Sequence, residues 1–366
     1  MTSARLLEVD ELSVVFSTAR GEVYGVDGVS FTLDHGETLG VVGESGSGKS
    51  VTATSLIGVR PPLTRVRTSG SARLEGRELL DMSEAELRGI RGAEIGYVFQ
   101  DPMTALDPSI PVGNQIVETL LVHTGLDKAG AQRRAVELLD MVGIPNAAAS
   151  TRNLPDQFSG GMRQRILVAL AISCRPKLLI ADEATTALDP TVQTQILALL
   201  RSLCRELSMA MIMITHDFGV VAATCDRVQV MYAGRIVERG SVADVLTGPR
   251  HPYTAGLLRL APRLEINHHH RLRPIPGRAP TAIRNEPGCR FSPRCEFADD
   301  RCHREEPPWS DGLTHASACW RNPAELASRD GGQAELASRD GGQAELASRD
   351  RGQAESTMLD RDREPR

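Results

Sequence analysis

A glycine-rich segment of eight residues constrains the fold of this 366-residue chain more than any other feature. It reads Gly43-Glu44-Ser45-Gly46-Ser47-Gly48-Lys49-Ser50, follows the β-prone run Thr38–Val42 and opens the helical pattern Ser50–Gly58. The glycines let successive backbone N–H groups point inward at phosphate oxygens, and the start of a helix adds positive charge there. The segment therefore predicts a site for a nucleoside triphosphate between a strand and a helix.

Contacts to the nucleotide are expected from the backbone of this segment and from two of its side chains. Lys49 would neutralise the β- and γ-phosphates, and the hydroxyl of Ser50 would ligate Mg²⁺. The predicted nucleotide-binding residues are Gly43, Ser45, Gly46, Gly48, Lys49, Ser50 and Val51.

Two adjacent acidic residues follow a second apolar run. Residues 178–181 predict a buried strand, and Asp182 and Glu183 come directly after it. Because the sites of α/β sheets lie at the carboxyl ends of the strands, we expect Asp182 beside the glycine-rich segment. Asp182 would hold Mg²⁺ directly or through water, and Glu183 would act as general base on an attacking water.

Short apolar runs alternate with helical patterns over most of the chain, which is typical of an α/β layered domain with a largely parallel sheet. The mainly helical stretch from Asp101 to Asn153 interrupts the alternation and indicates an inserted helical subdomain. We expect strands at Thr38–Val42, Ile95–Phe99, Lys177–Asp182 and Met209–Thr215, a hairpin over Arg227–Glu238, and helices at Ser50–Gly58, Lys128–Val142, Gly160–Ser173 and Thr191–Leu207.

Composition excludes several classes of protein. The net charge is −5, so we expect no broad basic surface for nucleic acid. No apolar run approaches the about 20 residues that span a bilayer, and the first ten residues lack the apolar core of a secretory signal. We therefore expect neither an integral membrane protein nor an exported one, and a reducing environment in which structural disulfides are rare.

The end of the sequence is repetitive. The unit Ala-Glu-Leu-Ala-Ser-Arg-Asp-Gly-Gly-Gln begins at Ala324, recurs at Ala334 and returns with one change at Ala344. Each unit offers a single leucine, which cannot bury enough apolar surface to offset the entropy lost on ordering. We expect residues 321–366 to be a disordered tail.

A second anion-binding helix start precedes the acidic pair. Phe158-Ser159-Gly160-Gly161-Met162-Arg163-Gln164-Arg165 resembles the signature motif of the ATP-binding cassette (ABC) ATPases, with Phe and Met where that motif has Leu and Gln. Ser159 would cap the helix, and Gly160 and Gly161 would expose N–H groups to an anion. The resemblance implies that two ABC subunits pair head-to-tail, each signature covering the γ-phosphate of the ATP held by the other.

Further positions match the same family. Gln100 resembles the glutamine that senses Mg²⁺ or the attacking water, and His216 resembles the histidine that contacts the γ-phosphate, so both join Glu183 as catalytic candidates. Asp189 ends a run that resembles the D-loop of the family. The resemblance also implies an aromatic side chain stacked on adenine, for which Phe16 fits the position and Tyr24 is the alternative.

The resemblance implies an architecture as well. We expect an α/β P-loop ABC ATPase core with an antiparallel β subdomain over residues 1–250, with the helical subdomain inserted at about 101–165. His251-Pro252-Tyr253-Thr254 and the segment from Cys289 to Cys295 resemble the C-terminal extension of ATPases that drive dipeptide, oligopeptide and nickel importers. This extension is expected over residues 251–320.

The function that the resemblance implies is that of a peptide-importer motor subunit, peripheral on the cytoplasmic face of the membrane. The implied partners are a second ATPase subunit (a copy or a paralogue), two membrane permeases and an extracytoplasmic substrate-binding protein. Nickel or another metal is the alternative cargo. A soluble ABC protein that acts on nucleic acid, or a non-hydrolysing regulatory subunit, fits less well, because the chain has one cassette and contains Glu183 and His216.

Four cysteines crowd into the extension with the spacing C-x5-C-x6-C-x16-C: Cys289, Cys295, Cys302 and Cys319. The spacing lacks the short cysteine pairs of most structural zinc sites. Four thiolates could still hold Zn²⁺ or a [4Fe–4S] cluster, or remain as thiols. The family resemblance favours the [4Fe–4S] cluster, in a structural role.

Overall fold

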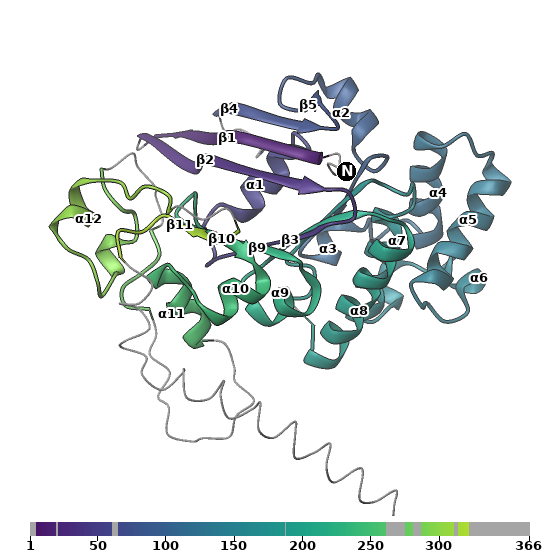
Figure 1. The fold of residues 1–366 in the computed structure, drawn as a ribbon. Helices are drawn as coiled ribbons and strands as arrows, with labels where there is room; N and C mark the ends of the chain where they lie inside the picture. The colour runs from purple at the N-terminus through teal and green to yellow at the C-terminus, as the bar shows by residue number, and fades with distance from the viewer. Residues whose placement is uncertain are drawn as a thin grey trace, which may run out of the picture. The chain divides into compact units, whose positions relative to one another are not determined.

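The computed structural model describes residues 5–19, 21–60, 65–186, 188–260, 275–280, 287–310 and 314–321. Met1–Trp320 form one compact unit and Arg321–Arg366 a second one. The tail that the sequence predicts to be disordered lies, apart from Arg321, outside the described residues. The fold is therefore that of the first unit, in which sheets and helices form separate layers (Figure 1).

An antiparallel sheet forms one layer of this unit. Its strands are β1 (Arg5–Thr18), β2 (Gly21–Asp34), β4 (Arg65–Leu74) and β5 (Arg77–Glu78), in the order β2-β1-β4-β5. The register of β1 against β2 shifts between Val9 and Leu12, and Glu11 between them has a positive φ of 47°. Buried aliphatic side chains of this sheet share a core with α1 (Lys49–Leu56), which connects the layer to the glycine-rich segment.

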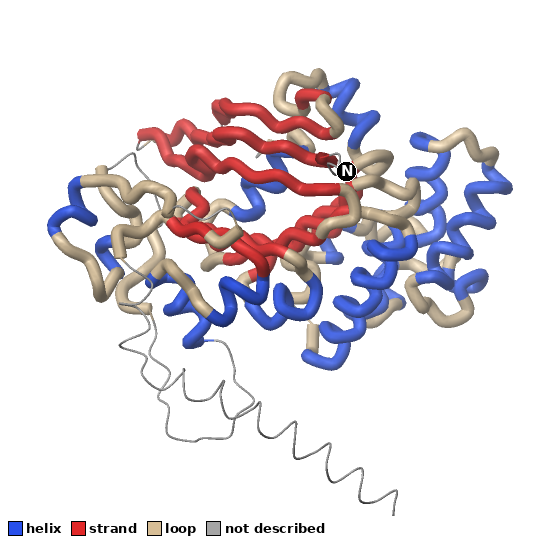
Figure 2. Tube along the Cα trace, in the orientation of Figure 1, coloured by secondary structure: helices blue, strands red, loops and turns tan. Residues whose placement is uncertain are grey.

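A sheet of seven strands forms the central layer (Figure 2). Its strands are β3 (Thr38–Val42), β6 (Ile95–Val98), β7 (Leu178–Asp182), β8 (Ala210–Thr215), β9 (Arg227–Tyr232), β10 (Arg235–Ser241) and β11 (Ala316–Ser317), in the order β11-β10-β9-β3-β8-β7-β6. The pairings β9-β3, β3-β8, β8-β7 and β7-β6 are parallel. The carboxyl ends of β3, β7 and β8 therefore meet at one edge of the sheet.

Helices cover the other side of this sheet and extend beyond its β6 edge. They are α3 (Pro102–Ala105), α4 (Val112–His123), α5 (Lys128–Met141), α6 (Ala147–Ser150), α7 (Gly160–Ala171) and α8 (Pro190–Glu206), with a 3₁₀ turn at Pro155–Gln157. Helix α2 (Glu84–Ile90) lies instead beside the antiparallel layer (Figure 1). Ile116, Leu138 and Ile166 are fully buried in one core that joins α4, α5 and α7 to the sheet. Helices α4, α5 and α6 gather together (Figure 1), as expected for an inserted helical subdomain.

The C-terminal region packs against the β9-β10 end of the central sheet. It contains α11 (Pro252–Leu260), a 3₁₀ turn at Ser292–Arg294 and α12 (Asp300–Arg304). The helices α9 (Phe218–Thr224) and α10 (Val242–Thr247) precede it in the chain. The fully buried carboxylate of Glu238 on β10 accepts hydrogen bonds from the backbone N–H groups of Arg250 and His251 and bonds to Nε2 of His315 at 2.7 Å. A buried carboxylate with several partners of this kind joins the C-terminal region firmly to the sheet.

The elements agree with the sequence expectations to within a few residues. The strand Thr38–Val42 is confirmed residue for residue, and the expected hairpin turns at Ala233-Gly234. No helix in the described part of the chain is long and apolar enough to cross a membrane. Because β10 pairs with β11 and Met1–Trp320 are one compact unit, the domain limits of 1–250 and 251–320 stay predictions.

Candidate nucleotide-binding site

The glycine-rich segment links β3 to α1, and its backbone wraps around the side chain of Lys49. The ammonium group of Lys49 is only 4% exposed and donates to the carbonyl oxygens of Gly43 at 2.8 Å and Glu44 at 3.0 Å. Burial lowers the pKa of Lys49, while the nearby charges of Glu183, Asp182 and Glu44 oppose that shift. A phosphate placed beside this ammonium would favour its charged form in the same way.

The shape of the segment depends on glycine. A Cβ on Gly43 or Gly48 would lie 2.1 or 2.3 Å from a backbone carbonyl oxygen, closer than any real contact allows. Gly48 has a φ of 104° and precedes the first residue of α1, while Ser45 and Gly46 form an exposed tip. The hydroxyl of Ser47 is buried and has no hydrogen-bond partner among the described residues. A glycine-dependent loop at a helix start, with an exposed tip at Ser45 and Gly46, suits a phosphate group.

Asp182 ends β7 next to this loop and accepts two hydroxyl hydrogen bonds. The hydroxyl of Ser50 donates to Oδ1 at 3.0 Å, and the hydroxyl of Tyr97 on β6 donates to Oδ2 at 2.8 Å. Burial raises the pKa of Asp182, and these two hydrogen bonds oppose the shift. Carboxylate and hydroxyl oxygens are ligands that Mg²⁺ accepts, so the donor set of Ser50 and Asp182 fits that ion. Gln100, for which the family resemblance implies a role in sensing Mg²⁺ or the attacking water, donates a hydrogen bond to Glu183, and its role toward Mg²⁺ stays a prediction.

Glu183 is the residue at which the predicted catalytic side chains meet. Its Oε2 accepts a hydrogen bond from Nε2 of Gln100 at 3.1 Å, and its Oε1 lies 3.7 Å from Nδ1 of His216 and 3.9 Å from Nζ of Lys49. Glu183 is 11% exposed and has a φ of 47°, a backbone conformation that non-glycine residues adopt mostly at functional sites and turns. The segments that follow four strands, β3, β6, β7 and β8, thus bring one ammonium, one amide, one carboxylate and one imidazole together.

The segment that resembles the signature motif begins α7. Ser159 caps the helix by accepting a hydrogen bond from the N–H of Met162 at 3.3 Å, and Gly160 is exposed in the first turn. Asp189 caps α8 through its bonds to two backbone N–H groups, and Gly161 packs against Val192 of that helix. Among the described residues, no hydrogen bond or ion pair joins Ser159, Gly160 or Gly161 to the glycine-rich segment.

The two aromatic candidates for adenine stacking lie in different cores. Phe16 on β1 is half-buried, lies against Gly25 of β2, and shares a core with Val51 of α1. Tyr24 on β2 is half-buried too, but it packs against the core of the C-terminal region. Of the two, Phe16 lies beside the helix that begins at the glycine-rich segment.

The four C-terminal cysteines lie close enough for their charges to interact. The pKa of Cys295 is raised to about 12, first by burial and then by the charges of Cys319, Cys289 and Cys302. However, the described residues contain no group of three or more His, Cys, Asp or Glu side chains that is placed to hold a metal ion. The four thiols are suitable donor atoms for the predicted [4Fe–4S] or zinc centre, but their arrangement in the described residues does not support such a centre.

Two contacts of the site were missed by reasoning from the sequence. Tyr97 donates to Asp182, and the signal for it was a hydroxyl-bearing residue inside an apolar strand that leads to Gln100. The other contact is the ion pair of Glu44 with Arg294. No motif connects these two residues, because they are separated by 250 positions.

These features define a class of protein. A glycine-rich loop after a parallel strand, a buried lysine, and two acids at the end of another parallel strand of the same sheet are the parts of a P-loop nucleoside triphosphatase. Comparison with known families agrees with that class. Residues 26–186 match the family described as ABC transporter, and residues 237–302 match the family described as the C-terminal region of oligopeptide/dipeptide transporters.

Curated relatives and solved structures extend these matches. The chain is 50% identical over 321 residues to the oligopeptide transport ATP-binding protein OppD of Salmonella typhimurium. These aligned residues cover 88% of this chain and 95% of that protein. It is 47% identical over 317 residues to the dipeptide transport ATP-binding protein DppD of Bacillus subtilis, covering 86% and 94%. A solved structure of the ATP-binding cassette MJ0796 shares the fold, with a TM-score of 0.58 over 64% of this chain and 98% of that one, at 24% identity. The chain belongs to the ATP-binding subunits of the oligopeptide and dipeptide ABC transporter family, and it is an ATPase.

Proposed function

We propose that this chain is the ATP-hydrolysing subunit of an importer for di- or oligopeptides. The observation that carries the proposal is the meeting of Lys49, Asp182, Glu183 and His216 at one edge of the sheet, in a chain whose C-terminal region matches that of oligopeptide/dipeptide transporters. The named relatives at about half identity support the same cargo. The imported substrate class is therefore a short peptide, with nickel as the cargo that a test must exclude.

For the reaction, the roles follow from the positions of the side chains. Lys49 neutralises charge on the β- and γ-phosphates, since its ammonium is held inside the loop that faces them. Glu183 accepts the proton of the attacking water. Gln100 orients the carboxylate of Glu183 through its hydrogen bond, and His216, which lies beside that carboxylate, orients the γ-phosphate. Water and ATP become ADP and inorganic phosphate. Ser50 and Asp182 would hold Mg²⁺, which supplies charge neutralisation when it is bound.

A second ATPase subunit is part of the proposal. Ser159 and Gly160 are exposed at the start of α7, and within the described part of the chain no hydrogen bond or ion pair joins them to the P-loop. An exposed anion-binding helix start suits a phosphate held by another subunit. Two membrane permeases and an extracytoplasmic substrate-binding protein complete the proposed assembly, which places this chain peripherally at the cytoplasmic face of the membrane.

Affinity purification of the full chain from membranes tests this assembly. We expect two hydrophobic permeases and a second ATPase to co-purify, together with ATP hydrolysis that rises when a substrate-binding protein loaded with peptide is added. Hydrolysis that responds to nickel and not to peptide would favour the alternative cargo. Co-purification of ribosomes or nucleic acid without permeases would contradict a role in transport.

We propose in addition that Cys289, Cys295, Cys302 and Cys319 bind a metal centre, with [4Fe–4S] preferred to Zn²⁺. The mutual closeness of the four thiols and the absence of C-x2–4-C pairs support it, although the side chains are not arranged as a metal site. Anaerobic purification followed by metal analysis and visible absorption should find about four irons per chain with acid-labile sulfide. One zinc per chain would support the alternative, and four titratable thiols without metal would contradict both.

The repetitive tail is proposed to be dispensable for hydrolysis. Each repeat contains one leucine, so it has no means of forming a core. A chain that ends at Arg321 should keep the ATPase rate and the unfolding temperature of the full chain. A loss of activity or of assembly with the permeases in that truncated chain would show that the tail has a role.

A further inference from the structure

Glu44, the second residue of the glycine-rich segment, is held by the C-terminal region of the chain. Its carboxylate accepts two hydrogen bonds from the guanidinium of Arg294, at 2.6 Å to Oε2 and 3.0 Å to Oε1. Its backbone N–H donates to the hydroxyl of Tyr253 at 2.8 Å. Its carbonyl oxygen accepts a hydrogen bond from Lys49 at 3.0 Å. That carbonyl also accepts from the backbone N–H of Ser47 at 3.2 Å. Every polar group of Glu44 thus has a partner, and two of the four partner residues, Tyr253 and Arg294, come from the C-terminal region.

Arg294 is fixed in place by further contacts. Its side chain is 6% exposed, its Nε donates to the carbonyl oxygen of Pro276 at 2.9 Å, and its guanidinium lies 3.4 Å from the hydroxyl of Tyr232. The hydrogen bonds of Glu44 raise the pKa of Arg294, so the guanidinium stays charged. A bidentate pair between an arginine and a carboxylate is both stronger and more directional than a lysine pair.

Tyr253 is equally well held. It is fully buried, and its ring centroid lies 4.6 Å from that of Tyr232 and 5.3 Å from that of Phe291. Phe291 and Arg294 belong to the same short segment, which folds back through a 3₁₀ turn. The aromatic cluster therefore presents the Tyr253 hydroxyl and the Arg294 guanidinium to the P-loop from one rigid support.

The charge of Glu44 gives this support a consequence for nucleotide binding. A carboxylate two residues into a loop that receives a triphosphate repels it, because like charges at short range disfavour each other. Arg294 neutralises that charge. Arg294 and Tyr253 together also fix the position of Glu44, whose carbonyl oxygen accepts the hydrogen bond from Lys49. Loss of Arg294 would leave the carboxylate uncompensated beside the phosphates.

We propose that Arg294 is a positioning residue of the nucleotide site, which acts through Glu44 to set the affinity of this chain for ATP. The inference rests on the proposed ATPase function and adds that the C-terminal region controls the P-loop directly. Its effect is expected in KM and in the ATP dissociation constant, while kcat changes little, since Arg294 touches neither the reacting atoms nor Glu183.

The test compares full-length variants by ATP titration and steady-state hydrolysis with Mg²⁺. Arg294→Gln should raise the dissociation constant and KM about tenfold, with kcat within about twofold of the unsubstituted chain. Arg294→Lys keeps the charge but loses the bidentate geometry of the guanidinium, so its dissociation constant and KM should lie between those of Arg294→Gln and the unsubstituted chain. Adding Glu44→Gln to Arg294→Gln should restore the affinity to within about threefold, because both members of the charge pair are then neutral.

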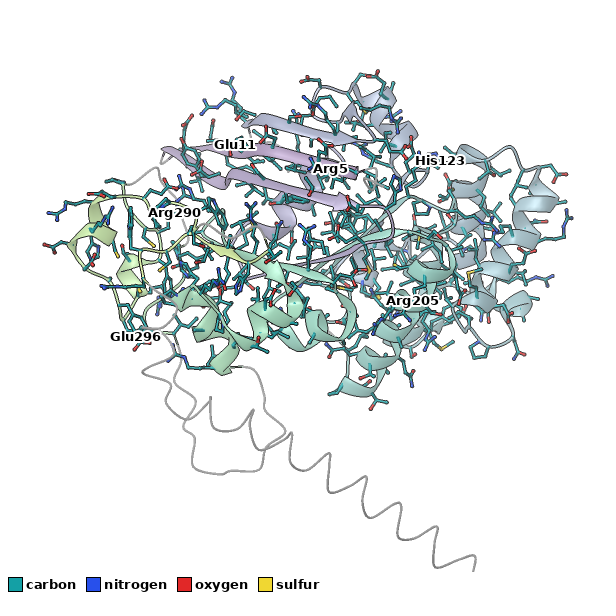
Figure 3. The ribbon with its side chains drawn as sticks, in the orientation of Figure 1. Arg5, Glu11, His123, Arg205, Arg290 and Glu296 are labelled. Carbon is teal, nitrogen blue, oxygen red and sulfur yellow. The ribbon has the colours of Figure 1, made fainter. Side chains whose placement is uncertain are left out.

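Arg259→Gln is the matched control. Arg259 on α11 pairs at 3.1 Å with Glu296 of the same C-terminal region, and Figure 3 labels Glu296. The substitution therefore removes an ion pair whose members belong to the C-terminal region and not to the P-loop. Unchanged ATP affinity in Arg294→Gln, or a loss that the added Glu44→Gln does not restore, would overturn the inference. Absence of ATP binding by the unsubstituted chain would instead overturn the proposed function, and the inference with it.

Discussion

Replacing Glu183 with glutamine is expected to lower the rate of ATP hydrolysis by about 10²–10⁴-fold, the usual contribution of a general base. The amide keeps the shape of the side chain and can still bond to Gln100, but it cannot accept the proton of the attacking water. ATP binding should persist, and the nucleotide-bound dimer should live longer because hydrolysis no longer makes it dissociate. Phosphate release and size-exclusion chromatography in ATP measure the two effects.

The control for this change is Glu137→Gln. Glu137 lies on α5 with 61% of its side chain exposed and pairs with Arg134, far in sequence from the glycine-rich segment. The control should hydrolyse ATP at the rate of the unsubstituted chain. If Glu183→Gln also keeps that rate, the assignment of the general base is wrong.

Replacing Lys49 with alanine should weaken ATP binding by about 10²-fold, as expected when a charged hydrogen-bond donor to phosphate is lost. Lys49 is the only lysine of the segment, and its ammonium is enclosed by the loop carbonyls of Gly43 and Glu44. Titration with ATP measures the change. Lys128→Ala, at the exposed first residue of α5, should leave the affinity as it was. Equal affinities for the two variants would contradict the role of Lys49.

Much of the site could be predicted from the sequence, because its parts follow strands directly. The glycine-rich segment comes after β3 and the acidic pair after β7, and strands of a parallel sheet place their carboxyl ends along one edge. Gln100 and His216 follow β6 and β8 in the same way. Local patterns and one topological rule predicted that the glycine-rich segment and the acidic pair lie near each other, whereas Gln100 and His216 were singled out by the family resemblance.

The antiparallel layer was harder to predict from residue patterns. β1 and β2 are each 14 residues long, yet β1 does not alternate strictly between buried and exposed positions. The register shifts near Glu11, and each shift moves later side chains to the other face of the sheet. Only the family resemblance indicated this layer.

The contacts that the C-terminal region makes with distant segments could not be predicted. The pairing of Glu44 with Arg294 and the burial of Glu238 against His315 depend on how the C-terminal region packs, and no periodicity in the sequence encodes either one. The cysteine spacing likewise gave the donor atoms of a metal site but not their arrangement.

The most direct test of the function is peptide uptake by cells that lack their own peptide-import ATPase and receive this chain with its permeases and substrate-binding protein. The account predicts that a labelled oligopeptide accumulates with the unsubstituted chain and fails to accumulate with Glu183→Gln, while nickel accumulation is the same in both. Nickel uptake that depends on Glu183 without any peptide uptake, or peptide uptake that persists in Glu183→Gln, would contradict it.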